Sequence, residues 1–340
     1  MPEDTKNIPF KIEWKKLTFP FLIFLVVVVV IFKFSELQEI GRLFGQAKWY
    51  WLLAALGCQV ANFLLQTMVY KVSFKLLNFN PFHFWRLLKT CITVIFLNYT
   101  VPSLGVAGNV WLLKQIRHKN LPEGKALMIV FIELICYYSA FLLLLLLSLV
   151  YLFFKLGHIG ETQKIAVAGF FVALSVLASC LYFFLGNKKS SKKRLFWLAE
   201  KIDKAEDGVR QEDRINKLVD DFYQDLKWLK VNKLKLVWPF CLQLTKFLTD
   251  GANIYLIFLA FGSWTPIGLG LVAFAFGRLF GILSFIPGGL GAFEGSMVVI
   301  FNSLGVTLEL SLATMLLYRL FSYWLYIPLG IVFYKSLEHD

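Results

Sequence analysis

The stretch IPGGLGAFE at residues 286–294 interrupts an apolar run that extends from 267 to 304. A similar stretch, VPSLGVAGN at 101–109, interrupts a second apolar run from 90 to 113. Proline lacks a backbone N–H and glycine adopts conformations that other residues avoid, so each stretch is expected to break a helix. Backbone groups freed at membrane depth must be buried in protein or face water. We therefore predict two broken, re-entrant helical elements.

Composition indicates that the rest of the chain also lies in a membrane. Of its 340 residues, 58% are hydrophobic and 17% are charged, and the mean hydropathy is +0.65. A soluble protein has too little interior for this composition. Apolar runs that suit a membrane-crossing helix occupy 17–32, 49–70, 126–154, 165–186, 236–261 and 310–334. The prediction is an all-α polytopic integral membrane protein with about six full transmembrane helices plus the two re-entrant elements.

The basic residues predict the orientation. If the two broken runs enter and leave on one side each, predicted cytoplasmic segments hold 27 of the 35 Lys and Arg residues and external segments hold 5. This asymmetry follows the positive-inside rule, with both termini in the cytoplasm and the protein in the plasma membrane. The net charge of +13 is then a consequence of topology, and no nucleic-acid partner is predicted.

The same analysis divides the chain into segments. The 187–235 segment carries 14 basic and 9 acidic residues with apolar positions at helical spacing, which predicts amphipathic helices on the inner membrane surface that contact anionic lipid headgroups. The predicted segments are a cytoplasmic N-terminus at 1–16, a first transmembrane half at 17–186 with a repeat unit at 49–154, the basic segment at 187–235, a second transmembrane half at 236–334 and a cytoplasmic tail at 335–340.

An internal repeat relates the two halves. A shift of about 185 positions aligns Pro102 with Pro287 and Asn109 with Glu294. It also aligns three polar residues of one span with three of another, at spacings that place each trio on one helix face: Gln59, Asn62 and Gln66 with Gln243, Lys246 and Asp250. One residue out of step, ELICYY at 133–138 aligns with RLFSYW at 319–324. A chance alignment of apolar helices is the alternative.

The predicted topology inserts the two repeat units in opposite directions. Inverted repeats with discontinuous helices at corresponding positions are typical of alternating-access transporters, whose binding site lies near the membrane midplane. The sequence therefore predicts a polar cavity between the two broken elements that accepts a polar substrate.

Ionisable residues within the predicted spans face that cavity in this interpretation, because a charge facing lipid costs roughly 2.5–3.5 kcal/mol or more. These residues are Glu133, Lys246, Asp250, Arg278, Glu294 and Arg319. Lys246 and Asp250 are four residues apart and are predicted to neutralise each other. Our hypothesis is that Arg278 or Arg319 contacts a lipid phosphate, while Glu294 faces an amine or pairs with one of these arginines. Proton transfer by Glu133, Asp250 and Glu294 is an alternative.

At these residues the chain resembles a known family. IPGGLGAFEGSMVVIFNSLGV at 286–306, followed by ATMLLYRLFSYWLYIPLG at 313–330, is similar to the signature of the lysylphosphatidylglycerol synthase transmembrane family, a flippase-like membrane domain. The first half departs from the family pattern, since AGNVWLLK carries Asn109 and Trp111 where charged groups are common. The resemblance implies lipid movement between leaflets, and no C-terminal aminoacyltransferase domain is expected.

The predicted function is a flippase-like transporter of an amphipathic, phosphate-bearing lipid. The alternatives are a membrane enzyme that uses Glu294 or Asp250 as general base, and a non-catalytic scaffold that recruits a partner through 187–235. No catalytic residue, metal or cofactor is predicted, and the substrate lipid and oligomeric state stay open. The predicted substrate-binding residues are Asn109, Glu133, Lys246, Asp250, Arg278, Gly288, Gly289, Gly291, Glu294 and Arg319.

Overall fold

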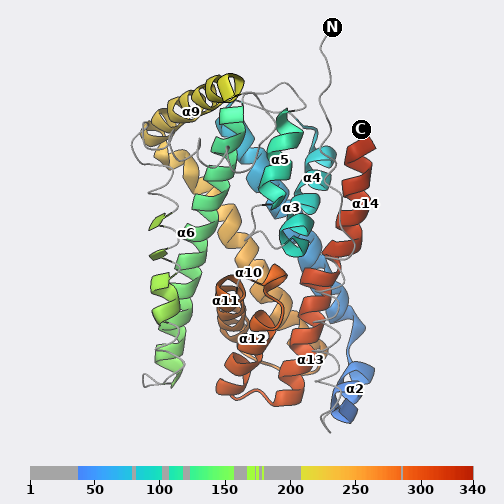
Figure 1. The fold of residues 1–340 in the computed structure, drawn as a ribbon. Coiled ribbons are helices and arrows are strands. Elements are labelled where there is room, and N and C mark those ends of the chain that lie inside the picture. The colour runs from blue at the N-terminus through green and yellow to red at the C-terminus, as the bar shows by residue number, and fades with distance from the viewer. Residues whose placement is uncertain are drawn as a thin grey trace.

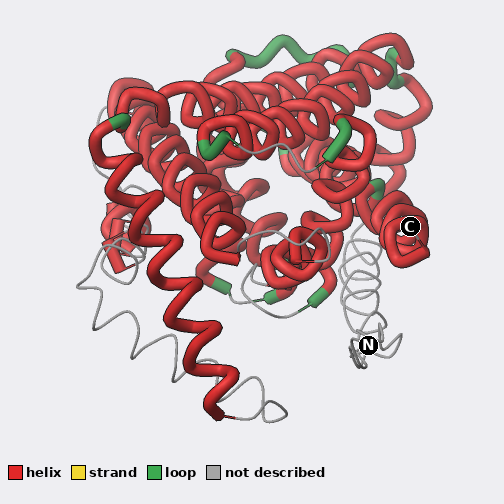
Figure 2. The backbone as a smooth tube through the Cα atoms, turned by 90° about the horizontal axis from the view of Figure 1, so that it is seen from above, coloured by secondary structure: helices red, strands yellow, loops and turns green. Residues whose placement is uncertain are grey.

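The computed structural model describes residues 37–78, 82–101, 107–117, 123–156, 167–172, 174–175, 178–179, 208–284 and 286–339. These residues form helices joined by turns and short loops, with no strand among them (Figure 2). The predicted all-α class is confirmed. The predicted span at 17–32 and most of the one at 165–186 lie outside the described residues.

The described helices lie on both sides of α9 (Gly208–Val231), which falls in the 187–235 segment. The first half contains α2 (Leu37–Gln46), α3 (Trp49–Leu76), α4 (Phe84–Thr100), α5 (Ala107–Arg117) and α6 (Glu123–Leu156). Between the halves lie α9 and the short η1 (Lys233–Leu236). The second half contains α10 (Val237–Ala260), α11 (Ile267–Leu283), η2 (Pro287–Gly289), α12 (Ala292–Ser303), α13 (Leu308–Arg319), the π-helical η3 (Leu320–Trp324) and α14 (Tyr326–His339).

Three stretches of helix in the described residues are long and apolar enough to cross a membrane. They are Trp49–Leu76, Gly124–Lys155 and Leu308–Glu338, and Ile267–Leu283 is a shorter apolar helix. The predicted span at 236–261 is also helical, as α10, although polar residues interrupt its apolar sequence. A polytopic helical membrane protein is therefore confirmed for the described part of the chain.

Both predicted helix breaks occur at equivalent places. Val101 after α4 is extended, with φ −96° and ψ 125°, and Ile286 after α11 is extended, with φ −84° and ψ 138°. Each of these residues precedes a proline, and the proline ring disfavours helical backbone in the residue before it. The chain becomes helical again at α5 and α12, in which Asn109 and Glu294 each occupy the third position.

The helices α3 and α10 cross in opposite directions at the centre of the molecule. The N–H of Lys48, just before α3, donates to the carbonyl of Ala260, the last residue of α10, at 2.8 Å. Further along, Asn253 Nδ2 of α10 donates to the carbonyl of Ala55 in α3 at 3.1 Å. The start of one helix therefore lies beside the end of the other.

The re-entrant hairpins lie at opposite ends of the molecule. Figure 1 shows α4 and α5 in the upper half and α11 and α12 in the lower half. The contacts between elements follow the same repeat. Helix α4 of the first half packs on α14 of the second half, and its counterpart α11 of the second half packs on α6 of the first half. The amphipathic α9 lies across the top, and α2 lies at the bottom. This is the arrangement expected of two inverted units.

Helix α9 lies in the later part of the 187–235 segment and buries one apolar face. Its buried face contains Val219, Phe222, Leu226 and Leu229. Phe222 packs edge-to-face on Phe131 of α6, with ring centroids 5.5 Å apart. The earlier part, 187–207, lies outside the described residues.

Candidate functional site

Polar side chains from α3 and α10 meet at the central crossing. Asn62 Nδ2 donates to Asp250 Oδ1 at 2.8 Å, and Lys246 Nζ donates to Gln66 Oε1 at 2.6 Å. In the sequence repeat Asn62 corresponds to Lys246 and Gln66 corresponds to Asp250. Each hydrogen bond is therefore the counterpart of the other under exchange of the two halves, which supports the repeat on geometric grounds.

The sequence interpretation of Lys246 and Asp250 as a pair within one helix needs correction. Each of the two residues hydrogen-bonds a side chain of α3, because the two helices bury their polar faces against each other. Their hydrogen bonds thus join the two halves of the molecule.

Helix α6 adds a carboxylate to this network. Glu133 Oε1 accepts from Gln66 Nε2 and from Gln243 Nε2, each at 3.4 Å. On the other side, Asp250 Oδ1 also accepts from the Tyr318 hydroxyl at 3.1 Å. Both carboxylates are buried, which requires such donors because an uncompensated charge in an apolar interior is unfavourable. The polar network therefore connects α3, α10, α6 and α13.

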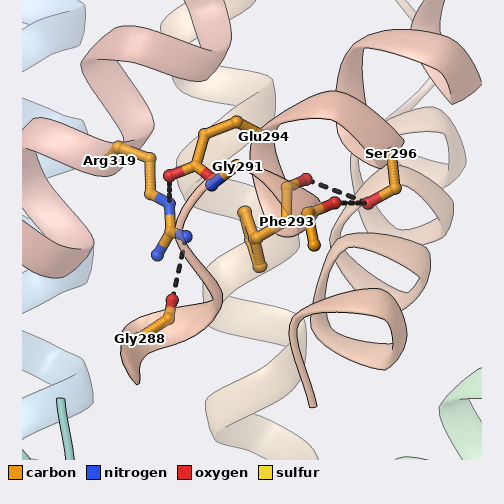
Figure 3. A network of polar contacts seen from close by, with 7 residues as sticks. Gly288, Gly291, Phe293, Glu294, Ser296 and Arg319 are labelled. Atoms are coloured by element: carbon orange, nitrogen blue, oxygen red, sulfur yellow. Dashed lines mark hydrogen bonds and ion pairs between the residues drawn. The ribbon is translucent and has the colours of Figure 1, made fainter. Parts of the chain in front are cut away.

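The second broken element carries a buried ion pair (Figure 3). Arg319 Nε lies 2.6 Å from Glu294 Oε1, and Arg319 Nη2 donates to the carbonyl of Gly288 at 3.0 Å. The other oxygen of Glu294 accepts from the N–H of Gly291 at 2.7 Å, which caps the start of α12. The pairing of Glu294 with an arginine, one of two alternatives from the sequence, is the observed one.

Aromatic rings surround the Arg319 guanidinium and connect it to the central network. Its Cζ lies 4.2 Å from the ring centroid of Phe293 and 5.2 Å from that of Tyr323. Phe293 stacks on Tyr318, whose hydroxyl contacts Asp250. Arg319 is thus enclosed by protein groups and joins η2 and α12 to α13.

The predicted glycines form the turn itself. Gly288, Gly289 and Gly291 have φ values of 64°, 67° and 85°, which favour glycine over other residues. A Cβ on Gly289 would lie 2.6 Å from the Cα of Gly281 in α11, and a Cβ on Gly288 would overlap the ring of Tyr323. These glycines therefore shape the broken element and allow its close packing.

Arg278 has surroundings different from those of Arg319. Its Nε donates to the Tyr137 hydroxyl at 2.6 Å, and its Cζ lies 5.7 Å from the centroid of that ring. The Lys246 ammonium lies 5.9 Å from the same centroid. Among the described residues, no carboxylate forms an ion pair with either cation. Both side chains are half-buried, so a ligand reaching this ring would meet two positive charges.

Of the predicted residues, Glu133, Lys246 and Asp250 meet at the crossing, and Gly288, Gly291, Glu294 and Arg319 meet at the second break. Asn109 lies half-buried on α5, at the position equivalent to Glu294. The sequence analysis did not identify the tyrosines that join these groups, Tyr99, Tyr137, Tyr318, Tyr323 and Tyr326. Tyrosines in otherwise apolar spans were the sequence feature that could have identified them, because each buried hydroxyl needs a hydrogen-bond partner.

Comparison with known proteins supports the family resemblance. The profile of the family described as lysylphosphatidylglycerol synthase TM region matches residues 18–330. A UPF0104 membrane protein of Methanothermobacter thermautotrophicus is 32% identical over 124 residues, which cover 36% of each chain. The aligned part thus spans about a third of that relative's length.

Two relatives from Methanocaldococcus jannaschii align over longer stretches. One UPF0104 membrane protein is 22% identical over 335 residues, or 95% of each chain. A second is 25% identical over 247 residues, which are 72% of this chain and 96% of the relative.

Proposed function

Since the chain belongs to the lysylphosphatidylglycerol synthase transmembrane family, we propose that it is a flippase-like transporter that moves an amphipathic, phosphate-bearing lipid between leaflets. The supporting observation is the pair of equivalent hydrogen bonds at the crossing of α3 and α10. Two inverted halves that share a buried polar centre can exchange their conformations around one binding site. The proposed route passes this centre, between the two broken elements.

The buried charges support a polar substrate. Glu133, Asp250 and Lys246 lie within helices whose other residues are mainly apolar. Such residues are unfavourable in a membrane unless they serve structure or transport. Lys246 and Arg278 have only neutral hydrogen-bond partners among the described residues, which favours an anionic group on the substrate.

The contacts of the two candidate bases favour transport over catalysis. Glu294 is held by Arg319 and by the N–H of Gly291, and Asp250 is held by Asn62 and Tyr318. A general base needs access to the proton that it removes, and these contacts occupy both oxygens of Glu294 and Oδ1 of Asp250. The membrane enzyme therefore ranks behind the transporter.

We also propose a plasma-membrane location with both termini in the cytoplasm and α9 on the inner surface. Exposed lysines follow the buried face of α9, at Lys230, Lys233 and Lys235. Such residues attract anionic headgroups within a Debye length of the surface. In this orientation the first re-entrant hairpin opens from the cytoplasm and the second from outside.

Reconstitution into vesicles tests the proposed transport. The full chain is inserted with acyl-labelled phospholipids, and leaflet exchange is followed by a quencher added outside. We expect wild-type protein to accelerate exchange and Arg278→Gln to slow it, because the proposed anion contact is lost. Lys335→Gln, at an exposed position on α14, is the control and should match wild type. If wild-type protein accelerates the exchange of no lipid, the transporter proposal is wrong.

A further inference from the structure

One face of α6 carries Glu133 and lies beside the cations of two neighbouring helices, Lys246 of α10 and Arg278 of α11. Tyr137 lies beside both Lys246 and Arg278. Glu133 lies four residues earlier, which places it about 6 Å along the helix axis on the same face. A ligand that extends along this face from Tyr137 therefore meets Arg278 first, then Lys246, and then the Glu133 carboxylate. Gln66 hydrogen-bonds both Lys246 and Glu133.

The carboxylate end also has a free hydrogen-bond acceptor. Gln243 donates to Glu133 through Nε2. The Oε1 of the same amide is buried and accepts no hydrogen bond within the described part of the chain. A buried acceptor without a donor is unfavourable by about 1–3 kcal/mol. A ligand with N–H groups would satisfy this oxygen and contact the carboxylate at the same time.

The cation end has the opposite requirement. The Lys246 ammonium donates to Gln66 and the Arg278 guanidinium donates to Tyr137, so neither charge is neutralised by contact with an anion in the residues described here. Lysine and arginine are the usual partners of phosphate oxygens, and both groups keep further N–H donors.

The charges around this face are balanced. Lys246 and Arg278 supply two positive charges to this region, and Glu133 and Asp250 supply two negative charges. A ligand with net charge would upset that balance in a membrane interior, where isolated charges are costly. A ligand that carries one charge of each sign leaves the balance unchanged and supplies a partner to each end.

We propose that this face of α6 binds a zwitterionic phospholipid headgroup, with the phosphate diester at Lys246 and Arg278 and a primary ammonium at Glu133 and Gln243 Oε1. The proposal rests on the lipid transport proposed above and names its substrate class. It also assigns the phosphate to Arg278 and away from Arg319, whose guanidinium contacts Glu294 and Gly288.

Equilibrium binding to the purified full chain in nanodiscs tests this proposal without any transport. A labelled phosphatidylethanolamine is displaced by phosphatidylethanolamine, phosphatidylcholine, phosphatidylglycerol or diacylglycerol. We expect phosphatidylethanolamine to bind roughly tenfold or more tightly than each of the others. Phosphatidylcholine lacks N–H donors, phosphatidylglycerol lacks the ammonium and diacylglycerol lacks both charges. Equal affinity for phosphatidylethanolamine and phosphatidylglycerol would overturn the proposal.

Inorganic phosphate distinguishes a headgroup from a free anion. We expect it to displace the labelled lipid far less effectively than phosphatidylethanolamine does, because it cannot contact Glu133 through an ammonium. If inorganic phosphate competes as well as the lipid does, the site binds free phosphate and the headgroup assignment is wrong.

Two variants test which residues contact the ammonium and which contact the phosphate of the headgroup. Glu133→Gln should equalise the affinities for phosphatidylethanolamine and phosphatidylglycerol, whereas Arg278→Gln should weaken both. Lys335→Gln should match wild type. Stepwise N-methylation of the ethanolamine tests the ammonium end in the wild-type protein, so the result does not depend on folding of the variants. A preference that persists in Glu133→Gln, or affinity that is unchanged by N-methylation, would contradict the assignment.

The binding proposal and the transport proposal can be contradicted independently of each other. If the headgroup preference is present but no leaflet exchange occurs, the site proposal stands and the transport proposal is wrong. If exchange occurs without any headgroup preference, transport stands and the zwitterionic site is wrong.

Discussion

Arg319 and Arg278 carry the same charge in the second half but have different partners. Arg319 contacts a carboxylate, a backbone carbonyl and two aromatic rings. Arg278 hydrogen-bonds a tyrosine and is half-buried. From the sequence, either arginine was an equal candidate for the phosphate contact, because the sequence shows a charged residue but not the groups that contact it. The surroundings of Arg319 indicate a structural role, and our proposal gives the ligand contact to Arg278.

Replacing each arginine by glutamine should therefore have different effects on stability. Arg319→Gln leaves the buried Glu294 without its cation, and we expect a loss of about 3–5 kcal/mol. Arg278→Gln removes no ion pair among the described residues and should change stability much less. Thermal unfolding in detergent provides the measurement, with Lys335→Gln as the control. Equal melting temperatures for Arg319→Gln and wild type would contradict the structural role.

At the scale of the elements, the turn at 286–291 has a defined backbone geometry that its glycines and its neighbours fix. Gly288, Gly289 and Gly291 have positive φ, and Gly288 and Gly289 pack closely against Tyr323 and Gly281. Glu294 caps the next helix. The neighbouring π-helical segment, Leu320–Trp324, directly follows Arg319. Such segments are rare and are often found at functional sites. Both irregular elements thus lie around one ion pair.

Alanine substitutions at two glycines test whether the backbone of this turn requires glycine. Gly288→Ala should destabilise the protein by roughly 1–3 kcal/mol, because its positive φ and the nearby Tyr323 ring disfavour a side chain. Gly295→Ala on α12 is the matched control, since a Cβ there meets nothing within 4 Å. That variant should be neutral or slightly more stable, as alanine favours helix. Similar melting temperatures for the two variants would argue against a constrained turn.

Several elements were predictable from the sequence for physical reasons. Pro102 and Pro287 forced the preceding residues, Val101 and Ile286, out of helical backbone. The spacing of Gln59, Asn62 and Gln66 placed them on one face, and all three are buried. These outcomes depend on local geometry, which the sequence contains.

The partners of the buried charges were less predictable. Lys246 and Asp250 suit an ion pair within one helix, yet each hydrogen-bonds across to α3. That choice depends on how two helices cross, which is a tertiary property. The same holds for Tyr137, whose role appears only when Lys246 and Arg278 are both placed beside it.

At the scale of the whole molecule, the account rests on two halves inserted in opposite directions. The antiparallel crossing of α3 and α10, the hairpins at opposite ends and the matched hydrogen bonds agree on this arrangement (Figure 1). The repeat is not symmetric in charge, because Asn109 stands where the second half has Glu294. The ion pair with Arg319 therefore belongs to the second half.

Cysteine labelling from each side of the membrane tests the inverted arrangement most directly. His83 lies just before α4 and Ser303 ends α12, and both are exposed. In a background whose five cysteines are replaced, His83→Cys and Ser303→Cys are treated separately with a membrane-impermeant maleimide in intact cells and in inverted vesicles. We predict that Ser303→Cys reacts in intact cells and His83→Cys reacts in inverted vesicles. Reaction of both positions from the same side would contradict the inverted repeat.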